Sequence, residues 1–288
     1  MGEYRTELVV VQPTSLCNLN CTYCYVPGRR VATRMTFEAL EAVCKKVLES
    51  ELVKDEIEFL WHAGEPLLAG IEFYERALNF MATYNKRGLR IRNNIQTNGT
   101  LLDSRWANFL ATHGFSVGVS IDGPSFLHDM QRVRWSGTGS HAATLRGVQE
   151  LRRHGIRPGA LCVLTRAALQ SPEELFDFFL DNDFSAVAFN VEEVENANRT
   201  TSLHPDEGNN SVVAEYTDFT RRLFDRWWPH RSKIRIREFH DLGQVFAAHR
   251  VDETYSREVF ETSPLRILTI HRDGNISTFS PEFAGSVA

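Results

Sequence analysis

Short hydrophobic runs alternate along the chain with longer stretches in which apolar residues recur every three or four positions. The short runs cover residues 8–11, 56–61, 91–96, 116–121, 159–164 and 186–191, and each is typical of a β-strand. Helical periodicity follows the first five, at 35–49, 71–84, from Ser104 onward, at 140–153 and behind Ser171. Strands that alternate with helices in this way predict βα units and a parallel sheet.

Two of these helices carry sequence signals at their first residues. Ser140 precedes the periodic stretch at 140–153 and is expected to cap it through its hydroxyl group. The string Ser171-Pro172-Glu173-Glu174 has the residue types and spacing of a capping box.

The alternation of strands and helices ends at residue 191. A different set of elements begins at about residue 211. Residues 192–210 are polar and without periodicity, so they predict a long loop. Residues 212–228 and 239–249 read as helices, with a short strand candidate at 234–237 between them. Asp273-Gly274 separates two alternating runs within 267–279, which predicts a β-hairpin. We therefore expect one domain over 1–210 and a small α+β extension over 211–288.

Composition narrows the class of protein. The chain has 288 residues, of which 42% are hydrophobic, enough for one large α/β domain or for a domain with an appendage. A net charge of −5 argues against a nucleic-acid partner held through phosphate contacts. There is no leader pattern and no apolar run that could span a bilayer, so we expect a cytoplasmic protein without a membrane partner. Five cysteines, three of them clustered, fit a reducing compartment.

The clustered cysteines follow the first predicted strand directly. Cys17, Cys21 and Cys24 have the spacing C-x3-C-x2-C, and three thiolates in one loop can hold three irons of a [4Fe–4S] cluster. Zinc is the chemical competitor, but a closed zinc site requires four ligands, and no second cysteine pair of that kind exists here. Cys44 and Cys162 fall on apolar faces and are expected to be core residues.

With Tyr23 before the third cysteine, this segment resembles the signature of radical S-adenosylmethionine (radical SAM) enzymes. The resemblance implies a partial (β/α)6 barrel, similar to a TIM barrel, whose strand ends surround one cavity. It also implies SAM bound to the open iron of the cluster, an external electron donor, and a 5′-deoxyadenosyl radical as the reactive product.

The resemblance further implies roles for residues that follow the other strands. Ala63-Gly64-Glu65-Pro66 is similar to the G-G-E-P motif that receives the SAM amino group, with alanine in place of the first glycine. The other residues implied to lie at SAM are Tyr23, Asn98, Ser120, Asp122, Arg132, Val163 and Leu164. Taken singly, these strings are also ordinary turn sequences, and Arg132 could equally be a solvated surface arginine.

Two glutamates after the sixth strand are candidates for acid–base chemistry. Glu192 and Glu193 lie where the cavity rim is expected, and a coupling to an aromatic ring must also remove a ring proton. The alternative interpretation is a solvated loop.

Several strings resemble peptide maturases that form cyclophanes, the GrrM/OscB type: residues 12–14, 61–67, 190–193 and 277–282. That resemblance implies a ribosomally made, Gly-rich, aromatic-containing precursor peptide, in which a side-chain β-carbon is joined to a ring carbon. Such enzymes carry auxiliary [4Fe–4S] clusters in a cysteine-rich SPASM extension, but no cysteine follows Cys162, so we expect a chain truncated before that extension. A formylglycine- or thioether-forming maturase and a metal-stabilised peptide-binding module without chemistry remain open alternatives.

Overall fold

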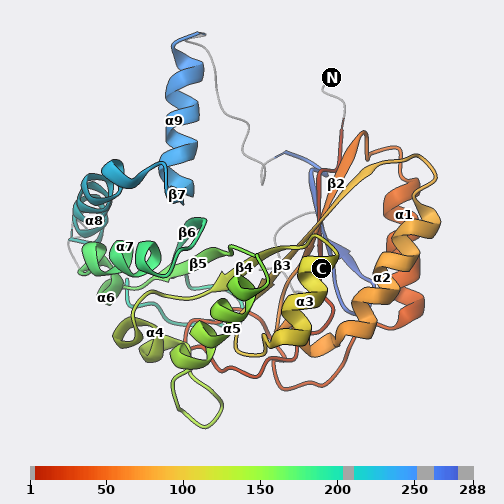
Figure 1. Cartoon of the computed structure of the whole chain (residues 1–288), viewed down its shortest axis with the longest axis horizontal. Coiled ribbons are helices and arrows are strands. Elements are labelled where there is room, and N and C mark those ends of the chain that lie inside the picture. The colour runs from red at the N-terminus through yellow and green to blue at the C-terminus, as the bar shows by residue number, and fades with distance from the viewer. Residues whose placement is uncertain (1–3, 204–210, 252–262, 278–288) are drawn as a thin grey trace.

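A nine-stranded, mostly parallel sheet organises the molecule (Figure 1). The computed structural model describes residues 4–203, 211–251 and 263–277. The strands are β1 (Leu8–Val11), β2 (Glu56–Trp61), β3 (Arg90–Thr97), β4 (Ser116–Ser120), β5 (Gly159–Leu164), β6 (Ala186–Val191), β7 (Arg235–Ile236), β8 (Ile267–Ile270) and β9 (Ile276–Ser277). Their order is β7-β6-β5-β4-β3-β2-β1-β8-β9, and within it only β8 and β9 pair antiparallel.

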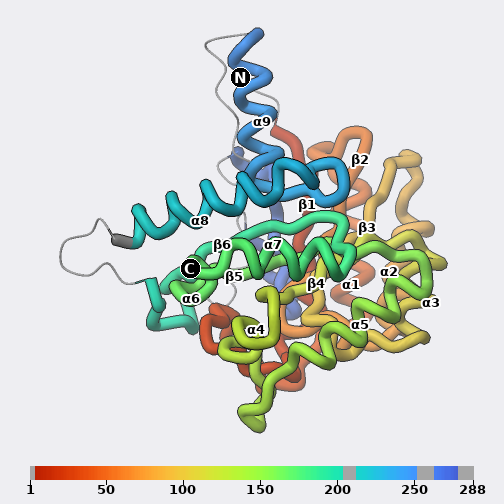
Figure 2. The backbone as a smooth tube through the Cα atoms, turned by 60° about the vertical axis from the view of Figure 1, so that its left-hand side comes forward, coloured from red at the N-terminus to blue at the C-terminus, as the bar shows by residue number. Residues whose placement is uncertain are grey.

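The helices connect successive strands and wrap one side of this sheet (Figures 1 and 2). They are α1 (Phe37–Glu49), α2 (Ile71–Tyr84), α3 (Ser104–Thr112), α4 (Ser125–Gln131), α5 (His141–Arg153), α6 (Arg166–Leu169), α7 (Pro172–Asp181), α8 (Ser211–Trp227) and α9 (Arg237–His249). Six strands followed by helices, in an open parallel sheet, confirm the expected α/β fold.

The core lies between the sheet and these helices. Alternate residues of β2 are buried, and the ring of Trp61 packs edge-on against Phe73 and Tyr74 of α2. Cys44 and Cys162 are both fully buried, as expected for core thiols. A packed core of this kind holds the strand ends in fixed positions, which the functional site requires.

The residues after 210 extend both edges of the same sheet. β7 pairs with β6, and β8 pairs in parallel with β1, from Leu8 opposite Ile267 to Val11 opposite Ile270. The predicted hairpin is present as β8 and β9, although its expected last residues lie outside the described part. α9 projects away from the body of the molecule (Figures 1 and 2).

The structure adds two short helices to those expected and corrects two expected helix caps. The segment before residue 140 contains α4, and a further short helix, α6, follows β5; both are too short for a periodic pattern to reveal. Ser140 makes no capping hydrogen bond to α5, because its hydroxyl donates to the Arg132 carbonyl instead. Ser171 makes no side-chain cap either, so the capping box is not formed.

A search of the described helices finds none that is long and apolar enough to cross a membrane.

Candidate functional site

The three clustered cysteines lie on a loop, here called the cysteine loop (residues 17–29), that leaves the carboxyl end of β1. The loop is closed at its base by the Cys17 N–H, which donates to the Arg29 carbonyl at 3.0 Å. The connection between α4 and α5 runs alongside it, and the N–H groups of Asn20 and Thr22 donate to the carbonyls of Val133 (2.7 Å) and Gln131 (3.0 Å). Two segments far apart in sequence therefore hold one loop.

The thiols of Cys17, Cys21 and Cys24 are all free and pack in one small cluster with Leu19 and Tyr23. Burial raises the pKa of Cys17 to about 12, with a further contribution from the charge of Glu65. Burial likewise raises the pKa of Cys21 to about 11. Metal binding to these thiols would therefore release protons.

Within residues 4–203, 211–251 and 263–277, no three His, Cys, Asp or Glu side chains are grouped as ligands of one metal ion.

Glu65 ties the end of β2 to the end of β3. Its carboxylate is fully buried and accepts hydrogen bonds from the Leu67 N–H (3.0 Å), the Thr97 hydroxyl (2.7 Å) and the Asn98 N–H (2.8 Å). Burial raises the pKa of Glu65 to about 7, although each of these hydrogen bonds favours the charged form. A cation close to this carboxyl group would stabilise its charged form.

Ala63 and Gly64 form a tight turn against the start of the cysteine loop. Both have positive φ, 71° and 59°, which is rare for alanine. A Cβ atom at Gly64 would lie 2.6 Å from the Leu16 carbonyl oxygen, so glycine is required there by space as well as by conformation. The Glu65 N–H donates to the same Leu16 carbonyl at 2.8 Å, which fixes this turn to the loop.

Asn98 connects this network to the cysteines. Its side-chain amide lies 3.8 Å from Cys17 Sγ and donates to Asn18 Oδ1 at 2.9 Å, while its own Oδ1 accepts the Thr100 N–H at 3.0 Å. These contacts bring the end of β3 directly to the cysteine loop.

Asp122, just beyond β4, makes hydrogen bonds to three other segments. Its carboxylate accepts from the hydroxyl of Tyr23, from Arg132 Nε at 3.0 Å and from the Val163 N–H at 2.9 Å. The Arg132 side chain is buried, so it is not a solvated surface arginine. Burial alone would lower the pKa of Arg132, but the Asp122 carboxylate reverses this and raises it.

His128 holds the backbone of Asp122. Its Nδ1 accepts the Asp122 N–H at 3.3 Å, and its Nε2 lies 2.9 Å from Ser140 Oγ. Because Ser140 donates its own proton to the Arg132 carbonyl (2.6 Å), Nε2 must be the donor in that pair and the ring is neutral. Burial lowers the pKa of His128 to about 2, in agreement with this arrangement.

Three other residues that were expected at SAM, Ser120, Val163 and Leu164, lie in different surroundings. Val163 packs against the cysteine cluster, whereas the next residue, Leu164, is buried in the main core. Ser120 Oγ accepts a hydrogen bond from Gln96 Nε2 at 2.9 Å. The alternation of β5 thus turns only Val163 toward the cysteines.

The two glutamates after β6 are not equivalent. The Glu192 carboxylate accepts hydrogen bonds from the Ser202 N–H (2.8 Å) and hydroxyl, so it anchors the loop that follows β6. Glu193 is exposed to solvent. Burial, and then the charge of Glu193, raises the pKa of nearby Glu195. The Ala197 N–H donates to the Tyr25 carbonyl at 3.2 Å, which brings this acidic loop against the cysteine loop.

Sequence reasoning missed three residues of the site. Trp135 Nε1 donates to the Cys17 carbonyl at 2.9 Å, Thr97 holds Glu65, and His128 holds Asp122. Trp135 and His128 come from the segment between β4 and α5. This segment has no hydrophobic periodicity from which the place of its side chains could be predicted. Thr97 precedes Asn98 and could have been found from its place at the end of β3.

The residues present fit the iron–sulfur cluster, with SAM beside it, that the cysteine motif implies. Three free thiols in one loop supply the donor set of a site-differentiated iron–sulfur cluster. The buried Glu65 carboxylate and the close backbone turn at Gly64 suit an amino group, since a buried carboxylate favours a cationic partner.

Comparisons with known proteins agree with this site. The family model of the radical SAM superfamily matches residues 11–179. An uncharacterised protein of Synechocystis is 36% identical over 282 residues, which are 96% of this chain and 69% of that protein. A cysteine-type anaerobic sulfatase-maturating enzyme of Clostridium perfringens is 32% identical over 248 residues, or 82% of this chain; the chain spans 65% of that relative's length.

Among solved structures, the chain is similar to native anSMEcpe with bound AdoMet and Cp18Cys peptide. The TM-score is 0.76 at 27% identity, over 94% of this chain and 74% of that one.

Proposed function

Because the chain belongs to the radical SAM superfamily, we propose that it modifies a side chain of a peptide or protein by radical chemistry. Its cofactors are a [4Fe–4S] cluster and S-adenosylmethionine, which together supply a hydrogen-abstracting adenosyl radical. The observation that carries the proposal is the contact between Asn98 and Cys17, since it joins the cysteine loop to the strand ends where parallel sheets bind ligands.

The roles of the residues follow from their contacts. Cys17, Cys21 and Cys24 hold the cluster. Glu65, with the backbone of Ala63 and Gly64, receives the amino group of SAM. The other residues that we propose at SAM are Tyr23, Asn98, Ser120, Asp122, Arg132 and Val163, of which Asp122 mainly positions Tyr23, Arg132 and Val163. Leu164, which the resemblance also placed there, lies in the main core.

For the reaction we propose a carbon–carbon crosslink between a side-chain β-carbon and an aromatic ring in a Gly-rich precursor peptide. The strings at 12–14, 61–67 and 190–193 support this type, and the fourth string, at 277–282, lies mostly outside the described residues. The crosslink removes a hydrogen atom from the β-carbon, and one proton and one electron from the ring. That electron passes to a one-electron acceptor such as an oxidised iron–sulfur cluster.

Glu193 is the base that we propose for the ring proton. It is exposed to solvent, whereas the carboxylate of Glu192 is occupied by Ser202. A base must reach the proton that it abstracts, which favours the free carboxylate.

A second candidate function is the maturation of a sulfatase-like protein, with oxidation of a cysteine or serine side chain to formylglycine. The 32% identity to a sulfatase-maturating enzyme favours it.

The superfamily chemistry is tested by anaerobic reconstitution with iron and sulfide, followed by dithionite and SAM, with 5′-deoxyadenosine measured by mass spectrometry. Cys17→Ala, Cys21→Ala and Cys24→Ala should each lose iron and product, while Cys44→Ala, a core thiol, should keep both. Well-folded wild-type protein that yields no iron and no deoxyadenosine would refute the proposal in favour of a binding module.

The two substrate types are separated by offering two peptides to the active protein. A Gly-rich aromatic peptide that loses two hydrogens and gains a ring-to-β-carbon bond supports the crosslink. A cysteine peptide that exchanges its thiol for an aldehyde, with the aromatic peptide unchanged, supports the sulfatase-maturase type instead.

A further inference from the structure

Two segments around the cysteine loop carry only positive charge. Residues 12–37 and 130–149 contain six arginines and no aspartate or glutamate, in a chain whose net charge is −5. One of the six, Arg132, is buried against Asp122. Arg29, Arg30, Arg34 and Arg134, here called the arginine patch, make no ion pair with any residue that the structure describes.

The arginine patch lies directly on the cysteine loop. Leu19 and Arg134 form an antiparallel bridge, so both charged segments run side by side. The guanidinium groups of Arg30 and Arg29 lie over the Trp135 ring, 4.2 and 5.6 Å from its centroid. The same indole donates to the Cys17 carbonyl, so the surface formed by the patch is one hydrogen bond away from a cysteine of the site.

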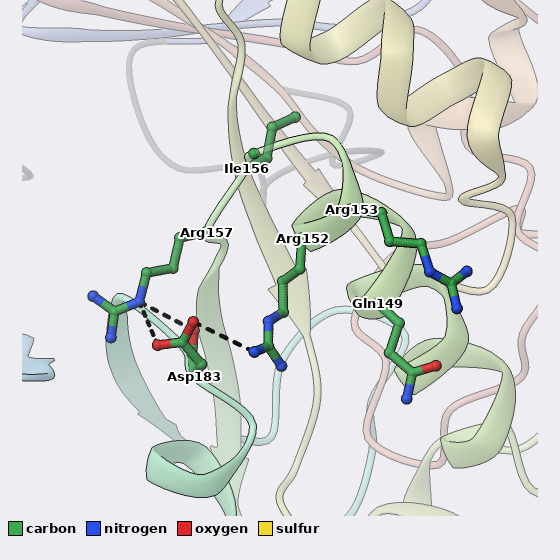
Figure 3. A pocket seen from close by; sticks show the side chains of 7 residues that line it. Gln149, Arg152, Arg153, Ile156, Arg157 and Asp183 are labelled. Carbon is green, nitrogen blue, oxygen red and sulfur yellow. Dashed lines mark hydrogen bonds and ion pairs between the residues drawn. The ribbon is translucent and has the colours of Figure 1, made fainter.

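A second group of arginines, at the other end of the sheet, has carboxylate partners. Arg152, Arg153 and Arg157 line a hollow of about 550 Å³ near the amino ends of β5 and β6, far from the carboxyl ends that carry the cysteines (Figure 3). There Asp183 forms ion pairs with Arg157 (2.8 Å) and Arg152 (3.6 Å), and Glu150 forms one with Arg153. No carboxylate pairs in this way with Arg29, Arg30, Arg34 or Arg134 within the described part of the chain.

We propose that the arginine patch is the docking surface for an acidic protein that delivers single electrons, of the ferredoxin class. The proposal rests on the proposed function, which requires electrons one at a time at the cysteines. One electron leaves the reduced iron–sulfur cluster of the carrier, which is oxidised, and enters the cluster held by the cysteines, which is reduced; no bond and no proton moves. Uncompensated positive charge attracts an acidic carrier and accelerates its encounter.

Binding is measured first, without turnover, by titrating the reconstituted protein with an oxidised plant-type [2Fe–2S] ferredoxin at low and high salt. We expect binding that weakens with salt, and a loss of about tenfold in affinity in the double variant Arg30→Glu/Arg34→Glu. Arg153→Glu changes an exposed arginine of the distant hollow and should bind as the wild type does. Equal effects of the two variants, or no binding by the wild type, would overturn the docking surface.

Turnover then separates this proposal from the proposed function. With dithionite, which needs no docking, the double variant should form 5′-deoxyadenosine at the wild-type rate; with reduced ferredoxin it should lose about tenfold in kcat/KM. A loss that is the same with both reductants would overturn the docking surface alone. Absence of product from wild-type protein with dithionite would instead refute the proposed function.

Discussion

Asp122 and Arg132 form a buried ion pair at the centre of the site, with 3.0 Å between Oδ2 and Nε and side chains only 3% and 8% exposed. The pair joins the end of β4 to the residue after α4. The same carboxylate also binds Tyr23 of the cysteine loop and the backbone of Val163 on β5. A single charged group therefore fixes the relative positions of three loops at the strand ends.

Asp122→Asn is expected to destabilise the cofactor-free protein by about 3 kcal/mol, because it leaves the buried Arg132 charge without its partner. The measurement is urea unfolding under anaerobic, reducing conditions. Asp177→Asn is the matched control, since its partner Arg226 (2.8 Å) pairs with it at the surface and the unfolding midpoint should stay close to that of the wild type. Equal midpoints for both variants would show that Arg132 does not depend on Asp122.

The sequence predicted the sheet well because its strands are strongly patterned. Burial on both faces makes runs such as Leu8–Val11 apolar, and helices of ten or more residues show their period clearly. The cysteines, Glu65, Asn98 and Asp122 were found because motif residues follow strands, and parallel strands bring their carboxyl ends together.

The residues that hold these groups in place could not be found in the same way. Trp135 and His128 belong to a connection whose path is decided by backbone pairing with residues 19–22, a long-range contact without a local sequence signal. One of the two expected caps, that of Ser140, is absent for a related reason. Ser140 was recruited by Arg132 and His128, because tertiary hydrogen bonds outcompete a local capping preference.

Gly64→Ala is expected to be far more damaging than Gly88→Ala, although both glycines have positive φ, 59° and 68°. At Gly88 the new methyl group meets no described atom within 4 Å, so only backbone strain of about 1 kcal/mol is added. At Gly64 it would also meet the carbonyl oxygens of Leu16 and Thr14 at 2.6 and 2.7 Å. Thermal melting and iron content after reconstitution check this; similar losses in both variants would mean that the turn at Gly64 can relax.

The neutral His128 predicts a loss of stability in acid. The pKa of His128 is about 2 in the folded protein and near 6.5 in the unfolded chain. Below pH 6.5 the unfolded chain therefore binds a proton at this residue that the folded protein does not bind. This histidine therefore favours folding fully above pH 6.5, and its contribution declines by about 1.4 kcal/mol per pH unit as the pH falls.

His128→Asn tests this slope, because the asparagine oxygen can still accept the Asp122 N–H while the titrating ring is gone. The variant should be less stable than the wild type at pH 7, since its bond to Ser140 is lost, but its free energy of unfolding should fall less steeply between pH 6.5 and 5. Parallel curves for the two proteins would show that His128 is not the group responsible.

The hydrogen bond from Trp135 to Cys17 predicts how firmly the cysteine loop keeps its metal. Trp135→Phe retains an aromatic ring for Arg30 but deletes the N–H donor, at a cost of about 1 kcal/mol, which corresponds to roughly fivefold faster opening of the loop. Iron release from the reconstituted protein to an anaerobic chelator should accelerate by about that factor. Trp106→Phe, a core substitution on α3, should lower the melting temperature without changing iron release. If both variants release iron at the same rate, general loosening explains the effect; if only Trp135→Phe is faster, the indole is a positioning residue that acts on the cluster through the backbone of Cys17.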